Sequence, residues 1–162
     1  MKYILSILFL CFLSVVISCN LRDDELPVTS RTTFVPPTSP ELVIVNLQYS
    51  IIEKDLNNYM MCFIDTNFNS RKYSYIPDVI SGIQYPVFRF WNTTNEKSYY
   101  NKLLSLTDPV STSNIFFSEL KWENYSDTAI FDARYLMRFD HTSANVAKNL
   151  KGKLRIILSS DS

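Results

Sequence analysis

Alternation of apolar and polar side chains between Thr128 and His141 is the feature that most limits the fold of this chain. One set is apolar or aromatic and consists of Phe131, Ala133, Tyr135, Met137 and Phe139. The other set is charged and consists of Asp132, Arg134, Arg138 and Asp140, with Ile130 and Leu136 as apolar exceptions. Because successive side chains of a β-strand point to opposite faces, this pattern predicts a strand with one face on a core and one in water.

Two other segments are expected to pair with this strand. Ile115 to Tyr125 precedes it, and Leu150 to Leu158 follows it with apolar residues alternating against Lys151, Lys153 and Arg155. Clean alternation is typical of antiparallel sheets with one solvated face, so the three segments predict a β-meander. The rows of alternating charge are expected to be solvated ion pairs rather than catalytic groups.

Helical signals come before the strands. Ser39-Pro40-Glu41 offers a capping hydroxyl, a proline for the first turn and an acid for the positive end of the helix dipole. Apolar residues then recur at helical spacing as far as Phe63. This periodicity predicts one long helix, or two short helices that meet near Lys54-Asp55.

The segment between this helical region and the meander is predicted to contain two strands and a helix. Phe68 to Ile76 is expected to form a strand, and Gln84 to Phe90 a shorter one. Thr93 and Glu96 match a capping box, which predicts a helix as far as about Leu106.

The first residues of the chain indicate export. Lys2 is followed by an apolar run from Tyr3, and a helix through Ile17 would rise about 22 Å. That is short of the roughly 30 Å hydrocarbon core of a bilayer, so a permanent transmembrane anchor is not expected. A charged start, a short apolar core and a small residue before Cys19 are typical of a secretory signal peptide.

Val16-Ile17-Ser18-Cys19 resembles the lipobox of bacterial lipoproteins. The resemblance implies that residues 1–18 are a lipoprotein signal peptide and that Cys19 becomes the first, lipidated residue of the mature chain. It also implies a diacylglyceryl thioether and an amide-linked acyl chain on Cys19, which together anchor far more firmly than one chain. The alternative is ordinary secretion with Cys19 as a free thiol.

Residues 19–38 are rich in proline, threonine and serine and predict a flexible tether. Within them, Arg22-Asp23-Asp24-Glu25 is similar to the signal that sends Bacteroidetes-type lipoproteins to the outer face of the outer membrane. The alternative is a solvated linker that carries no signal. The resemblance implies a lipid-anchored envelope protein whose membrane contact is the lipid on Cys19.

Charge and cysteine content exclude several function classes. The chain has 16 basic and 16 acidic residues, and cleavage before Cys19 would remove only Lys2, leaving a net charge of −1. No basic footprint for nucleic acid is present. Cys62 has no partner for an intrachain disulfide once Cys11 is cleaved off and Cys19 is lipidated. With a single histidine and one internal cysteine, neither a metal site nor a cofactor site is expected.

The order of predicted elements resembles the NTF2-like (cystatin-like, SnoaL-like) superfamily. The local match lies at Ser39-Pro40-Glu41, Asn46-Leu47, the stretch Lys54 to Tyr59, and Cys62-Phe63, which are similar to uncharacterised Bacteroidetes-type lipoproteins. The resemblance implies that residues 39–162 form an α+β cone, with N-terminal helices packed on a curved antiparallel sheet and a largely apolar pocket on its concave face. Relatives often pair through the sheet, so a homodimer is one expectation.

The end of the sequence departs from this family. NTF2-like chains usually finish with a further strand, whereas this one ends with Ser159-Ser160-Asp161-Ser162, which resembles the turn alone. A missing strand would leave backbone groups of its neighbours unpaired. Either the reading frame is truncated, which we favour, or another segment or subunit fills the slot.

Aromatic side chains are the main candidates for a binding site. Seven of them, including Phe139, fall on predicted inward faces, and six of these are candidates to line a pocket if they do not simply fill the core: Tyr49, Tyr59, Phe63, Trp91, Phe131 and Tyr135. His141 ends a strand beside Asp140, and it is expected to face a turn rather than form an Asp-His dyad, because adjacent strand residues point to opposite faces. Cys62 is expected to be a small buried hydrophobe. No residue is assigned as catalytic.

Two functions are therefore open. The leading hypothesis is a non-enzymatic envelope lipoprotein that binds a small ligand or a protein partner. The alternative, which follows from the family resemblance, is a SnoaL-like isomerase or hydrolase that uses an acid or a tyrosine in the pocket. A degraded reading frame whose product does not fold is a third possibility.

Overall fold

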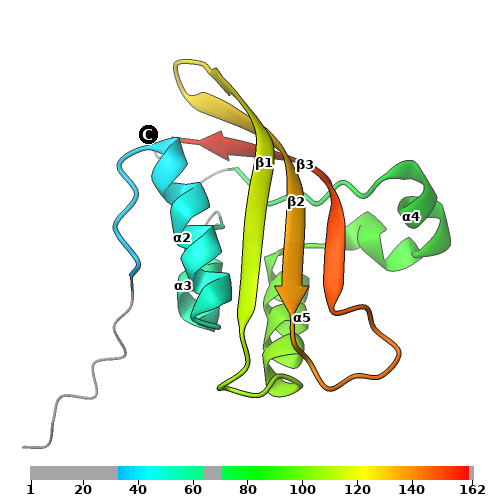
Figure 1. Cartoon of the computed structure of the whole chain (residues 1–162). Coiled ribbons are helices and arrows are strands. Elements are labelled where there is room, and N and C mark those ends of the chain that lie inside the picture. Colours follow the sequence, from blue (N-terminus) through cyan, green and yellow to red (C-terminus); the bar gives the residue numbers. More distant parts are fainter. Residues whose placement is uncertain (1–32, 64–70, 161–162) are drawn as a thin grey trace, which may run out of the picture. The chain divides into compact units, whose positions relative to one another are not determined.

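The computed structural model describes residues 33–63 and 71–160, and Figure 1 shows how their helices and strands are arranged. The predicted signal peptide, Cys19 and the tether as far as residue 32 lie outside the described residues, as do residues 68–70 of the first predicted strand. The described residues belong to one unit that begins at Thr33. None of the described helices is long and apolar enough to cross a membrane.

Three long strands form the sheet: β1 (Ser113–Asn124), β2 (Thr128–Phe139) and β3 (Asn149–Ser159). They are antiparallel neighbours in the order β1-β2-β3 and lie side by side in Figure 1. The register of β1 on β2 shifts between Ser118 and Lys121, where Glu119 has a left-handed φ of 53°. Such a bulge bends a strand and increases its twist. The predicted β-meander is confirmed, and with the helices it confirms the α+β class.

The N-terminal helical segment is divided into α2 (Pro40–Ile52) and α3 (Leu56–Met61). Lys54 between them has a left-handed φ of 57°, which ends the first helix. The Asp55 side chain then accepts hydrogen bonds from the N–H groups of Asn57 and Asn58, at 2.8 and 3.0 Å, and caps the second. The two-helix alternative is therefore confirmed. Ser39 stands at the N-cap of α2, but its side chain makes no capping hydrogen bond.

The two strands predicted between α3 and the meander are wrong for the residues that the structure describes. Residues 71–78 have no regular secondary structure, and the following segment forms α4 (Val79–Gln84) and the 3₁₀ helix η1 (Pro86–Phe90). Asp78 caps α4 through the N–H groups of Ile80 and Ser81. These residues pair with no described strand, and local signals favour helix instead, because Asp78 caps α4 and a proline begins η1.

The next helix, α5 (Thr93–Ser105), agrees with the prediction in extent but not in its cap. Asn92 is the N-cap, and its side chain accepts from the N–H groups of Thr94 and Asn95. The Asn95 side chain accepts in return from the N–H of Asn92, which completes a capping box one residue earlier than predicted. The Glu96 side chain is therefore not needed for the cap of α5.

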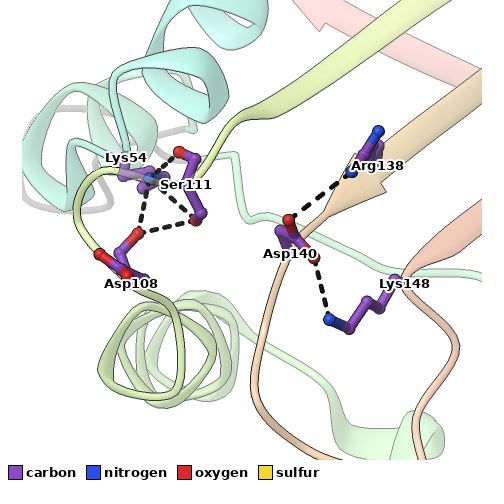
Figure 2. A network of polar contacts seen from close by, with 6 residues as sticks. All are labelled: Lys54, Asp108, Ser111, Arg138, Asp140 and Lys148. Atoms are coloured by element: carbon purple, nitrogen blue, oxygen red, sulfur yellow. Dashed lines mark hydrogen bonds and ion pairs between the residues drawn. The ribbon is translucent and has the colours of Figure 1, made fainter.

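Lys54 joins the turn between α2 and α3 to the loop between α5 and β1. Its ammonium group donates to the backbone carbonyls of Asp108 and Pro109, both at 2.9 Å, and to that of Ser111 (Figure 2). One side chain thus connects two segments that are more than fifty residues apart in sequence. Near the start of the domain, Val35 similarly exchanges two backbone hydrogen bonds with the Asn46 amide.

The core lies between the helices and one face of the sheet, in two clusters. One contains Ile51, Tyr100, Ile115 and Phe139, and the other contains Ile44, Phe131 and Ala133. The predicted inward face of β2 is therefore confirmed. The opposite face carries ion pairs, including Arg155 with Asp132, and Asp140 with Lys148 and Arg138 (Figure 2). Exposed pairs of this kind contribute at most about 1 kcal/mol each.

Within the described residues β3 pairs only with β2, so its other edge is unpaired. The expectation of a sheet without the further strand thus holds for this part of the chain. Figure 1 shows α4 beyond that edge, on the side of β3 away from β1.

Candidate functional site

Glu96 is at the centre of a polar network that is partly buried beneath aromatic side chains. The residue lies in the first turn of α5 and is 8% exposed. Its Oε1 accepts a hydrogen bond from the Tyr59 hydroxyl at 2.7 Å. Its Oε2 accepts from the Trp91 indole Nε1 at 2.6 Å and from the Tyr73 hydroxyl at 3.3 Å. Both carboxyl oxygens therefore have partners, and all three donors are aromatic.

Aromatic rings surround this network. Tyr59 stacks on Tyr100 with ring centroids 3.9 Å apart, and Phe63 contacts both Tyr59 and Tyr73 at about 5 Å. Burial raises the pKa of Tyr59 well above its ordinary value, and the negative field of Glu96 raises it further. The same two causes raise the pKa of Tyr73. The hydroxyls therefore keep their protons near neutral pH and remain donors to the carboxyl group.

This arrangement suits a structural role for Glu96. Glu96 forms no ion pair with any lysine or arginine of the described residues, so its hydrogen bonds are with neutral donors. A buried polar group with a full set of partners makes the core specific, and losing a partner is costly. A carboxyl group with both oxygens in use has little capacity left for a ligand.

The sequence-predicted pocket residues are distributed over different places. Tyr59, Phe63 and Trp91 converge on the Glu96 network. Phe131 lies in the second core cluster, where it is 1% exposed. Tyr135 packs over Gly152, since a β-carbon there would come within 3.0 Å of the tyrosine ring.

The expectation for Tyr49 is wrong, because this side chain is 40% exposed. The side chains that α2 buries are Ile44, Asn46, Ser50 and Ile51. Two of these four are polar, so the apolar pattern alone indicated the wrong edge of the helix.

An apolar groove runs between α2 and the strands. It is lined by Glu41, Ile44, Val45, Phe117, Leu120, Trp122 and Phe131, and its volume is about 200 Å³. Phe131, which contacts Phe117 and Trp122 edge-on or tilted, is the predicted pocket residue that lines this groove. Glu41 is the only titratable group in its lining, so the groove offers little chemistry.

His141 lies in a second cavity, of about 130 Å³, at the C-terminal half of α5. The lining residues are Tyr99, Lys102, Leu103, Leu106, His141, Ser143 and Val146. His141 faces the turn between β2 and β3, as expected, since its Nε2 lies against the Ala147 carbonyl, and the residue is only 2% exposed. Its backbone bridges to Thr107, and the N–H of Thr142 donates to the Leu106 carbonyl at 2.7 Å, which folds the end of β2 against the helix.

The hydrogen bonding of His141 is incomplete. Its Nε2 lies 3.4 Å from the Ala147 carbonyl oxygen, which is a long contact. Its Nδ1 is buried and has no hydrogen-bond partner in the described chain. Most buried polar atoms in proteins are paired, so this nitrogen is an exception, which it shares with the hydroxyls of Ser113 and Ser159 among the described residues.

The structure also describes the other candidate reactive groups, Asp140 and the half-buried Cys62. Asp140 pairs with Lys148 at 2.9 Å and with Arg138 at 3.6 Å, so it forms no dyad with His141 (Figure 2). The Cys62 thiol lies 3.3 Å from the Asn58 carbonyl, and burial raises its pKa to about 12. Among the described residues no cluster of histidine, cysteine and acidic side chains could hold a metal ion.

Comparisons with known proteins gave two structural neighbours. No family model matches the chain, and no curated protein matches it. A protein of unknown function from Mycobacterium tuberculosis has a TM-score of 0.49 and 13% identity over 74% of this chain, which spans 63% of that protein. A "putative dehydratase from the NTF2-like family" from Streptomyces avermitilis has a TM-score of 0.44 and 8% identity, over 72% of this chain and 78% of that protein.

Proposed function

We propose that this protein is a lipid-anchored envelope protein whose NTF2-like domain binds a small ligand in the His141 cavity. The lipobox ending at Cys19 and the proline-rich tether support the anchor, and the acidic cluster after Cys19 supports the outer membrane as its location. The α+β arrangement and the order of elements support an NTF2-like domain.

The observation that carries the binding role is a largely apolar recess beside α5 whose lining includes the buried His141. Ligand sites in proteins are mostly apolar recesses with a few placed polar groups. This cavity combines the apolar side chains of Leu103, Leu106 and Val146 with polar groups from Tyr99 and Ser143. In the Glu96 network, in contrast, both carboxyl oxygens already have hydrogen-bond partners within the protein.

The anchor is tested by mass spectrometry of the protein purified from membranes of its native host. We expect a mature chain that begins at Cys19 and carries acyl groups on that residue. The Cys19→Ala variant should lose the acyl groups and leave the membrane fraction. An unmodified sulfur in the native product would refute the anchor.

The binding site is tested with a variant that fills the cavity. Val146→Phe places a larger side chain in the lining, and Val110→Phe at an exposed loop position serves as the matched control. Small-molecule hits are first identified by ligand-observed NMR on the wild-type domain. We expect Val146→Phe to abolish binding of those hits and Val110→Phe to preserve it. Equal binding by both variants would place the site elsewhere.

A SnoaL-like isomerase or hydrolase is the second candidate, and His141 is the observation that favours it. His141 lines the cavity, and an imidazole that reaches a bound molecule can act as a general base. This candidate predicts turnover of a bound molecule that disappears in His141→Gln while binding persists. Recovery of every hit unchanged after prolonged incubation would favour the binding role.

A further inference from the structure

We propose that the outer edge of β3 binds an extended protein segment in which acidic and apolar residues alternate. The segment would join the sheet as an antiparallel strand beside β3, as the neighbouring strands of the described sheet already are. This inference is independent of the His141 cavity. It uses the backbone groups of β3, the charge on one face of that strand and the partial exposure of the other.

The backbone of β3 has hydrogen-bonding groups at its outer edge. The Phe139 N–H donates to the Lys148 carbonyl oxygen at 2.8 Å. Because alternate residues of an antiparallel ladder bond to a given neighbour, this bond and the register of β2 on β3 direct the even-numbered residues of β3 towards β2. The N–H and C=O groups of the odd-numbered residues, which include Lys151, Lys153 and Arg155, therefore point to the outer edge, where no described strand pairs with them.

The side chains of the same three residues form a positive row on the solvated face of the sheet. Arg155 pairs with Asp132. Lys151 and Lys153 are exposed and form no ion pair within residues 33–63 and 71–160. Lys153 also lies directly opposite Arg134 of β2. A strand added at this edge would place its own side chains beside the row, and acidic side chains would be attracted there.

The other face of β3 is apolar and only partly buried. Leu154 and Ile156 pack against the second core cluster but keep part of their surface exposed. Their neighbours in β2, Ala133 and Phe131, are 5% and 1% exposed. Apolar side chains at alternate positions of an added strand would cover this surface, while the acidic ones lie on the charged face.

A second copy of β3 suits this edge less well than an acidic segment. If two copies paired in antiparallel fashion about Lys153, the two Lys153 side chains would lie opposite each other, and Lys151 would lie opposite Arg155. Like charges directly opposite each other destabilise a sheet. Charge complementarity therefore favours a different chain with acidic residues at these positions.

The edge is tested with a short peptide that alternates valine and glutamate, and a valine–lysine peptide of the same length is the control. The protein is the mature chain with Cys19 replaced by serine. At about 1 mM glutamate peptide we expect amide hydrogen exchange at Lys151 and Lys153 to slow about tenfold. The amides of Gly152 and Leu154, which face β2, should not change. Unchanged exchange at the two lysines would overturn the proposal, and so would equal protection by the lysine peptide.

N-methylation of the peptide separates backbone pairing from simple charge attraction. In the proposed pairing the glutamates lie opposite Lys151 and Lys153, so the glutamate N–H groups donate to β3 and the valine N–H groups point away. Methylation of the glutamate nitrogens should abolish binding in fluorescence anisotropy. The same number of methyl groups on the valine nitrogens should preserve it. Any other pattern would overturn the antiparallel pairing.

The role of charge is tested by combining Lys151→Glu with Lys153→Glu. We expect the glutamate peptide to bind about tenfold more weakly at low salt, with the urea midpoint of the protein unchanged. Lys97→Glu combined with Lys102→Glu changes the net charge equally at exposed positions of α5 and should bind as the wild type does. Equal weakening in both variants would refute the edge site.

Occupation by a second copy is a separate outcome of the exchange experiment. If the Lys151 and Lys153 amides become protected as the protein concentration rises without peptide, β3 pairs with itself and the proposed partner is wrong. We expect no such dependence at low salt, where the lysines of two copies repel each other most strongly.

Discussion

Glu96 and His141 are two buried titratable side chains that differ in how many of their polar atoms have hydrogen-bond partners. Glu96 is 8% exposed and accepts three hydrogen bonds from Tyr59, Tyr73 and Trp91. His141 is 2% exposed, with one long contact and one nitrogen without a partner. Burial alone therefore does not show whether the polar atoms of a side chain have hydrogen-bond partners.

The difference follows from what surrounds each residue. The donors to Glu96 come from α3, from the segment before α4 and from the residue after η1, so several parts of the chain converge on it. His141 lies just after β2, where Leu103, Leu106 and Val146 supply no polar atoms from their side chains. The fold thus supplies hydrogen-bond partners to Glu96 and leaves one nitrogen of His141 without a partner among the described residues.

The strongest test of this comparison removes the Glu96 carboxyl group. Glu96→Ala leaves three buried donors without an acceptor, and an unsatisfied buried group costs about 1–3 kcal/mol. We expect the free energy of unfolding in urea to fall by about 3 kcal/mol or more, or the domain not to fold. Glu119→Ala, which removes an exposed ion pair with Arg134, is the control and should cost less than about 1 kcal/mol. A loss of equal size in both variants would contradict the structural role of Glu96.

The donors to Glu96 should differ in importance according to their geometry. Tyr59→Phe removes a hydrogen bond of 2.7 Å and should lower the free energy of unfolding by about 1–2 kcal/mol. Tyr73→Phe removes a bond of 3.3 Å and should have a smaller effect. Urea unfolding of the two variants side by side measures the order. The reverse order would show that the Oε1 contact is not the stronger one.

His141 should respond differently from Glu96. His141→Leu removes polar atoms that are poorly satisfied and keeps a similar volume, so we expect the free energy of unfolding to change by less than about 1 kcal/mol or to rise. The measurement is the same urea titration, without ligand. If His141→Leu lowered the free energy of unfolding as much as Glu96→Ala, the imidazole would have to be hydrogen-bonded as fully as the Glu96 carboxyl group.

The smallest expected effect concerns the Cys62 thiol. Burial raises its pKa from an ordinary value of 9.0 to about 12, so the folded state favours the protonated thiol. The stability this contributes is complete below about pH 9 and is lost as the pH rises towards 12. In a mature chain with Cys19 replaced by serine, we expect alkylation of Cys62 at pH 8 to be slow until urea unfolds the domain. Alkylation at the rate of a free thiol in the native state would contradict this protection.

Much of the fold could be predicted because its signals are local. The alternation in β2 and the Lys54-Asp55 break between α2 and α3 both follow from short stretches of sequence. The strands predicted at residues 71–76 and 84–90 failed because β-type composition alone does not make a strand: the first segment is irregular, and the Asp78 cap and Pro86 direct the second into helices.

The two buried titratable groups could not be predicted for a similar reason. Glu96 matched a capping box with Thr93, but asparagine is the stronger N-cap, and Asn92 with Asn95 formed the box instead. The role of Glu96 then depended on Tyr59 and Tyr73, which are distant in sequence. Alternation assigns faces within a strand, and it gave no information on where the chain would place His141 after β2 ended.

The unpaired edge of β3 has a consequence for the behaviour of this protein at high concentration. Such an edge can recruit the strand of a neighbouring molecule and start aggregation. On the outward face of β3, Lys151 and Lys153 form no ion pair with any described residue, and edge lysines are a common protection against this pairing. Their mutual repulsion between molecules would weaken as salt screens it. Colloidal stability should therefore be greatest in dilute buffer and should decline as ionic strength increases.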